Sequence, residues 1–290
     1  TEIYTEELQA NTQAGTQTEN NEETSMSGPD TPELFDSLHE ALENRAPLWE
    51  FHLRTALFLR TQTLTEHPTD AIERWIEEEI PLPTLGDEDE DHTAAELARQ
   101  LARDVLLEFA RRQRLEQETL DTRGMRELVE SYLPEEEERH AKLESTVQRL
   151  LVDATFLKRH SDKTWTFSHP LWTDYFTACH LLDTEDGYNV VLDHLFDPTW
   201  SRIVSFFATQ ADALDLVREL LSPKRTEARV PRLLRATYWA VNTPAETPWR
   251  RTLMKALAQS FVNRDSDLAD RLIVGRALAQ VVGRSARAFF

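Results

Sequence analysis

The chain has 290 residues, of which 52 are Asp or Glu and 32 are Lys or Arg, so its formal net charge is −20. So acidic an average surface repels DNA and anionic membranes, which disfavours both as partners. The single cysteine, Cys179, excludes an intrachain disulfide, and no apolar stretch approaches the ~18 residues of a membrane-spanning helix. We therefore expect a cytoplasmic protein without a membrane partner. Because the chain begins with Thr1 rather than Met, we also expect further sequence upstream.

Arginine dominates the basic residues. Only five of the 32 are lysines, which leaves 27 arginines. An acidic surface poor in lysine suits a cytoplasm with much salt, where charges are screened. The composition thus favours a halophilic microbial source, with GC-rich codon usage as the alternative explanation.

The first 86 residues divide into a polar segment and a helical segment. Residues 1–30 are rich in Thr, Gln, Asn and Glu and cannot bury enough apolar surface to offset the cost of ordering, so we expect disorder. Residues 31–86 are expected to be helical, with a helix that begins at Pro32, an apolar helix over 49–64 and a short helix after it. The acidic run 86–91 is interpreted as a solvated linker and as the next domain boundary.

Residues 91–183 have the pattern of a winged-helix domain. A capping box at 93–96 precedes a long amphipathic helix, and two further helices follow it. Two β-prone runs, 155–160 and 164–167, flank a polar turn and predict a hairpin, the wing. A helix over 170–182 closes the domain.

Everything after Gly187 is expected to be helical. Helices are predicted from Pro198 and over 211–221, 230–241, 248–261 and 267–282. Their lengths and short links are typical of stacked helix pairs, so residues 187–290 are interpreted as an α-helical superhelical region of the HEAT type. The predicted fold class is therefore mainly α: a winged helix with a short β-hairpin wing, followed by this region.

One histidine lies where the hairpin passes into the last helix of the predicted winged helix. His169 follows the β-prone run and directly precedes Pro170. The first four backbone N–H groups of a helix lack partners within the helix, and such an end attracts anions, phosphate above all. A histidine at this point could donate to the same anion. The alternative interpretation is a surface histidine at a helix start.

The sequence contains no motif for self-contained catalysis. A phosphate-binding P-loop requires G-x-x-x-x-G-K-[ST], and none of the seven glycines precedes a lysine. G-x-G-x-x-G, G-x-S-x-G, H-E-x-x-H and paired cysteines are absent too, so we predict no catalytic residue and no metal site. Cys179 and His180 point about 100° apart on one helix and cannot pair as nucleophile and base. This chain is not expected to be an enzyme by itself.

The segment Phe167-Ser168-His169, followed by an aromatic helix, resembles the end of the winged-helix domain in NACHT-type STAND NTPases. Members often have Phe-Ser-His, three further residues, and then Gln-Glu-Tyr/Phe-Phe-Ala-Ala. The chain departs from this pattern at Thr173-Asp174 and at Thr177, and an ATPase core is missing. The resemblance covers about residues 93–221, while residues 31–83 would correspond to the helical lid that joins the ATPase core to the winged helix.

This resemblance implies a regulatory, sensor-proximal fragment of a signalling NTPase, of the kind that acts in antiphage defence. In that family the motif histidine reaches the β-phosphate of ADP on the ATPase core, so His169 would be the nucleotide-sensing residue. ADP or ATP would be bound by an upstream NTPase core, and this fragment alone would bind neither. The implied partners are that core, an unidentified protein trigger and, on activation, further copies of the chain. The other motif residues would serve packing: Phe167, Ser168, Trp172, Tyr175 and Phe176.

Two other functions fit the same residues. A DNA-binding winged-helix regulator would use the basic wing residues Lys158, Arg159 and Lys163. The acidic Glu144 and Asp153 on its recognition helix disfavour nucleic acid as a partner, since phosphate contacts dominate DNA affinity. A helical protein-interaction scaffold without any nucleotide linkage is the third hypothesis.

Overall fold

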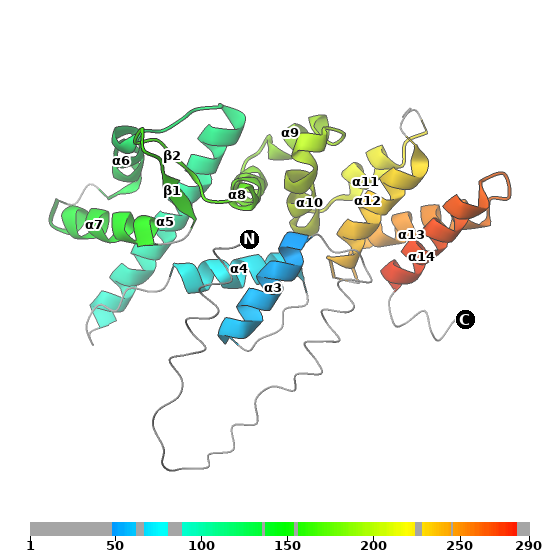
Figure 1. Cartoon of the computed structure of the whole chain (residues 1–290), viewed down its shortest axis with the longest axis horizontal. Helices are drawn as coiled ribbons and strands as arrows, with labels where there is room; N and C mark the ends of the chain where they lie inside the picture. The colour runs from blue at the N-terminus through cyan, green and yellow to red at the C-terminus, as the bar shows by residue number, and fades with distance from the viewer. Residues whose placement is uncertain are drawn as a thin grey trace, which may run out of the picture.

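The structure is a computed structural model that describes residues 48–61, 67–80, 89–134, 137–153, 156–223, 228–244 and 246–282. The expected disorder of residues 1–30 and the helix expected from Pro32 lie outside these ranges. Within them the chain is mainly helical with a single two-stranded hairpin, which confirms the predicted mainly α class. Figure 1 shows the helices as an elongated array in which α8 has a central place.

Within the described ranges, two helices precede the acidic run. Helix α3 (Leu48–Thr61) and helix α4 (Pro68–Glu79) lie against each other, and Figure 1 shows the pair beneath α8 and α10. Pro68 occupies the first turn of α4, where its missing N–H costs no helical hydrogen bond. Ile72 and Ile76 bury one face of α4, as their spacing of one helical turn predicts.

Helix α5 (Asp89–Leu115) begins earlier than the sequence suggested. The acidic residues 89–91 belong to its first turn, so the solvated linker predicted over 86–91 is wrong for that part. The predicted capping box is wrong as well, because Thr93 lies inside the helix and cannot be its N-cap. Acidic side chains are favourable in the first turn, where the helix dipole is positive, and that explains a helix start within an acidic run.

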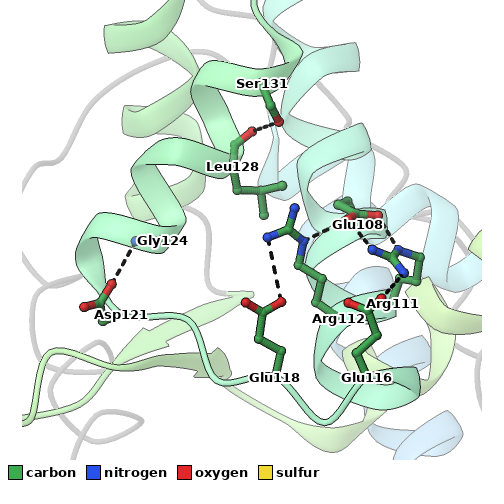
Figure 2. A network of polar contacts seen from close by, with 9 residues as sticks. All are labelled: Glu108, Arg111, Arg112, Glu116, Glu118, Asp121, Gly124, Leu128 and Ser131. Carbon is green, nitrogen blue, oxygen red and sulfur yellow. Dashed lines mark hydrogen bonds and ion pairs between the residues drawn. The ribbon is translucent and has the colours of Figure 1, made fainter.

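The turn after α5 is held by an ion-pair network that Figure 2 shows in close-up. Glu108 accepts hydrogen bonds from Arg111 and Arg112, and Arg111 also donates to Glu116 at 2.7 Å. The hydrogen bond with Arg111, supported by Arg112, lowers the pKa of Glu108 to about 2. The network fixes the direction in which the chain leaves α5, just before Gln117 takes the left-handed conformation with φ 56°.

Two further helices and the hairpin follow in the predicted order. Helix α6 (Thr122–Tyr132) is capped by Asp121, whose carboxylate accepts from the Gly124 amide at 2.8 Å (Figure 2). Helix α7 (Glu137–Asp153) packs against α5. Strand β1 (Leu157–Arg159) then pairs antiparallel with β2 (Trp165–Phe167) in a register that places Lys158 opposite Thr166.

The hairpin is also joined to the segment that precedes α6. Asp121 forms an isolated antiparallel bridge with Thr164, and the Trp165 amide donates to the Leu120 carbonyl at 2.9 Å. The short sheet thus gains a third backbone segment, which comes from the connection between the first two helices of this group. Helix α8 (Pro170–Leu182), with the bounds predicted from the sequence, starts directly after β2.

Helix α8 is buried nearly all round because it packs against α5 on one side and against α10 on the other (Figure 1). Its apolar positions do not form a single stripe, as expected for a helix at the centre of a core. Cys179 is one of these buried residues, 7% exposed, and burial raises the pKa of its thiol to about 12. Cys179 is therefore a small residue of this core.

The described residues after Gly187 are mainly helical, as predicted. Its elements are α9 (Gly187–Asp193), the 3-10 turn η1 (Pro198–Trp200), α10 (Ser201–Gln210), α11 (Leu214–Leu220), α12 (Arg229–Val241), α13 (Pro248–Val262) and α14 (Leu268–Val282). Helix α9 was not predicted, because seven residues make fewer than two turns and give no apolar periodicity to recognise. Gly187 is required at its start, since a Cβ there would lie 1.8 Å from the Leu181 carbonyl oxygen.

Arginines link these helices through their carboxyl ends, where unpaired carbonyls carry partial negative charge. Four side chains donate to carbonyls in or just after a helix's last turn: Arg235 to Leu195 after α9, Arg232 to Leu220 and Ser222 at α11, Arg250 to Thr243 after α12 and to Val281 in α14, and Arg271 to Phe261 in α13. Part of the arginine excess therefore serves the folding of this region.

Candidate functional site

His169 is the N-cap residue of α8, and its own ring closes the helix end. The residue is extended, with φ −141° and ψ 140°, and its ring Nδ1 accepts a hydrogen bond from the Leu171 amide at 3.0 Å. The Trp172 amide donates to the His169 carbonyl at 3.1 Å, and Pro170 has no N–H at all. The expectation of four backbone donors free for an anion is therefore wrong, because the first three positions offer none.

This capping bond sets the tautomer of the ring. A backbone N–H can only donate, so Nδ1 is unprotonated and the ring proton of the neutral form lies on Nε2. No described residue bonds to Nε2, and His169 is exposed. Partial burial and the charge of Arg202 lower the pKa of His169, while Asp174 acts in the opposite direction. The side chain is thus a neutral hydrogen-bond donor at pH 7.

A salt bridge beside His169 joins α8 to α10. The Arg202 Nε lies 2.6 Å from an oxygen of Asp174, whose side chain is only 10% exposed. Burial raises the pKa of Asp174, and Arg202 and Arg114 oppose that shift. Arg114 itself donates to the Thr199 carbonyl at 2.6 Å, which adds α5 to the same junction.

Sequence reasoning missed Asp174 and Arg202 as members of this site. The available signal was Asp174 itself, an acidic residue among the apolar positions of the helix predicted over 170–182. A carboxylate there needs a partner, because an unpaired buried charge is very costly. Its partner lies 28 residues further along the chain, so only the folded structure identifies it.

The motif aromatics lie in the core. Phe167, Trp172, Tyr175 and Phe176 are at most 7% exposed. Phe176 packs between Phe156 and Phe167, while the Tyr175 ring meets the α10 residue Phe206 edge-on with the ring centroids 5.5 Å apart. Ser168 is exposed, and its amide donates to the Phe156 carbonyl. These side chains position α8 and with it His169.

The basic wing residues are exposed on the hairpin. Lys158, Arg159 and Lys163 each have an exposed side chain. Lys163 has φ 69°, and its carbonyl accepts from the hydroxyl of Thr122, which fixes the turn against α6. The structure therefore leaves three cationic groups exposed on the hairpin, two in β1 and one in the turn that follows it.

Other kinds of site are poorly supported. The described residues contain no group of three or more His, Cys, Asp or Glu side chains that could hold a metal ion. A groove of about 240 Å³ lies between α4 and α5. It does not include His169, and its lining is largely charged: Ile76, Glu77, Ile80, Glu96, Arg99, Gln100 and Arg103.

Comparison with known proteins yields no relative: no family model, no curated protein and no solved structure matches the chain. None of the helices in the described ranges has both the length and the apolar character to cross a membrane. The functional assignment therefore depends on the residues and their geometry.

Proposed function

We propose that the chain is the regulatory, sensor-proximal part of a signalling NTPase of the NACHT/STAND type. Residues 91–183 would form its winged-helix domain and residues 187–290 its HEAT-like superhelical region. One observation carries the proposal: His169 caps α8 with Nδ1 and so presents Nε2–H, on an exposed ring, as a neutral donor. A donor of this kind suits a phosphate oxygen supplied by a neighbouring domain.

The topology of residues 89–182 supports the winged-helix assignment. Three helices are followed by a hairpin, and the hairpin pairs with the connection between the first two helices through Asp121 and Thr164. That third segment makes the small sheet part of the domain and not a free loop. It also means that His169, which follows β2, is held on a rigid support.

The contacts around His169 suggest how a phosphate contact would be transmitted. A hydrogen bond to Nε2–H would favour one position of α8 relative to the domain that supplies the phosphate. Because Asp174 of α8 is paired with Arg202 of α10, the position of α8 also fixes the start of the superhelical region. A coupling of this type is worth about 1–3 kcal/mol, enough to bias a two-state equilibrium.

ADP or ATP fits this arrangement only when an upstream core binds it. Within the described residues His169 offers one hydrogen bond to a phosphate, and the nearby guanidinium of Arg202 is already paired with Asp174. The chain also has no P-loop. The nucleotide would supply the phosphate charge, and His169 would report its presence.

The test uses the complete reading frame that contains this chain, purified with its bound nucleotide. His169→Asn is the decisive variant, because Asn is a good N-cap residue but lacks the distant Nε2–H donor. We expect His169→Asn to retain the wild-type Tm and to lose at least half of the bound ADP, measured by chromatography after denaturation. His169→Ala should lose the ADP and also about 1 kcal/mol of stability through the lost cap.

The outcomes are distinct. An unchanged ADP content in His169→Asn would assign His169 to capping alone and refute the sensor role. A reading frame without G-x-x-x-x-G-K-[ST] upstream would refute the NTPase assignment as a whole. The exposed His160 is the matched control: His160→Asn on the wing should leave the ADP content unchanged.

A second candidate function, DNA binding, is favoured by the exposure of Lys158, Arg159 and Lys163 on the hairpin. A gel shift at low salt that Lys158→Glu and Lys163→Glu abolish would support it over the nucleotide-sensing proposal. DNA binding would be excluded if no gel shift occurred at 50 mM salt or below and the His169→Asn variant had lost bound ADP.

The third candidate, a helical scaffold, is favoured by exposed apolar side chains near the α13–α14 turn. Val262 is 66% exposed, and Leu268 and Leu272 are each 63% exposed. Scattered exposed apolar residues are ordinary, but several on adjacent turns indicate a contact surface. Loss of partner binding in Leu272→Glu, with nucleotide content unaffected by His169→Asn, would favour this function.

A further inference from the structure

Helices α3 and α4 contact both the helices that precede Gly187 and those that follow it. At one end Trp49 of α3 meets Phe206 of α10 edge-on, with the ring centroids 5.5 Å apart. Phe206 also contacts Tyr175 of α8 at the same centroid distance, so the three rings form a junction of α3, α8 and α10. Phe206 is only 3% exposed, and the α3–α4 pair therefore covers part of the α8–α10 junction.

Helix α4 is attached to α5 and α8 through the carboxylate of Glu73. Glu73 receives two hydrogen bonds from the Arg103 guanidinium of α5, at 2.9 and 2.8 Å, in the paired geometry that suits arginine and carboxylate. The hydroxyl of Tyr175 in α8 donates to the same carboxylate. Burial of Tyr175 raises the pKa of its hydroxyl, which therefore stays a donor at any physiological pH.

A second glutamate, on α3, makes the same kind of contacts with the helices that follow Gly187. Glu50, 4% exposed, is paired with Arg54 at 3.0 Å and accepts from the hydroxyl of Tyr238 in α12 at 3.3 Å. Burial raises the pKa of Glu50, and Arg54 and Tyr238 oppose the shift. Each end thus has a glutamate on the helical pair, an arginine beside it, and a tyrosine from the structure beneath.

We propose that α3–α4 is a releasable strap, closed across the α8–α10–α12 junction by these two tyrosine–glutamate contacts. The helices beneath also contact one another directly, since α8 packs on α5 and α10, and α12 packs on α10, α13 and α14. Opening the strap would uncover Phe206 and would free α12 from its contact with Glu50. The strap would thereby regulate how the helices after Gly187 lie against α8, whether or not a nucleotide is involved.

Hydrogen exchange of the 290-residue chain tests the strap. Tyr175→Phe and Tyr238→Phe keep the buried rings and remove only the two hydroxyls. In the double variant we expect exchange in 48–61 and 68–79 to accelerate about tenfold for each hydroxyl removed, because each bond is made to a charged acceptor. Exchange in α8 and α12 should stay within twofold of the wild type.

A matched control separates release of the strap from general loss of stability. The hydroxyl of Tyr188 in α9 accepts from the Leu216 amide at 3.1 Å, away from α3 and α4. Tyr188→Phe should leave exchange of the strap unchanged, and equal acceleration in this control would overturn the proposal. It would also be overturned if exchange in α8 rose together with that of the strap, or if the double variant had no effect.

Discussion

Removing the Arg232 guanidinium should destabilise the helices after Gly187 more than any exposed arginine does. Arg232 is 8% exposed, and one of its terminal nitrogens donates to both the Leu220 and Ser222 carbonyls, at 2.5 and 2.9 Å. Hydrogen bonds from a charged donor contribute about 1.5–3 kcal/mol each. The buried Nε has no partner among the described residues and subtracts from that gain. We therefore expect Arg232→Met, which keeps an apolar stem, to lower the free energy of unfolding by about 2–3 kcal/mol.

Urea unfolding followed by circular dichroism measures this difference, and a fall in Tm of ~5–10 °C should accompany it in a chain of this size. The exposed Arg229, in the same first turn of α12, is the control, and Arg229→Met should change the stability by less than about 0.5 kcal/mol. Arg232→Lys should recover only part of the loss, since an ammonium is a more strongly hydrated point charge. If Arg232→Met is as stable as the wild type, burial of the cation costs as much as its bonds contribute, and the reasoning fails.

Three further predictions concern α5, α6 and α8. The pKa of Glu108, lowered from 4.5 to about 2, should give stability that is complete above pH 4.5 and is lost as the pH falls toward 2; Glu108→Gln should flatten the dependence of Tm on pH in that window. Asp121→Ala should cost about 1 kcal/mol through the lost cap of α6, with Asp121→Asn close to wild type in thermal melts. Cys179, buried and with a thiol pKa of about 12, should react with a disulfide reagent at pH 8 only in denaturant; rapid labelling of the folded chain would contradict the structure.

Local patterns predicted the elements well and their ends less well. The apolar periodicity and proline positions placed α4, α8 and α12 to α14 within a few residues. The start of α5 was misplaced because Thr93 and Glu96 satisfy a capping box in sequence, yet the acidic residues before them continue the helix. Helix α9 was missed because so short a helix depends on packing and leaves no periodic signal.

The candidate site, too, could be predicted only in part from the sequence. That His169 begins α8 could be read from a β-prone run followed by Pro170. The bond from the Leu171 amide to its ring could not, since it depends on the side-chain rotamer and the extended backbone of one residue. This bond changes the interpretation of the site from an open helix end to a single imidazole donor.

Composition and periodicity were thus sufficient for the mainly helical class, for the position of the hairpin and for the absence of a P-loop, because each is a property of neighbouring residues. The pairing of Asp174 with Arg202, the arginine bonds to helix carboxyl ends and the attachment of α3–α4 through Glu73 and Glu50 emerged only in the folded chain. Partners in these contacts lie on different helices or loops and are separated by 7 to 188 residues. Whether they meet depends on how helices pack, and side-chain packing between distant segments leaves no periodic trace in the order of the residues.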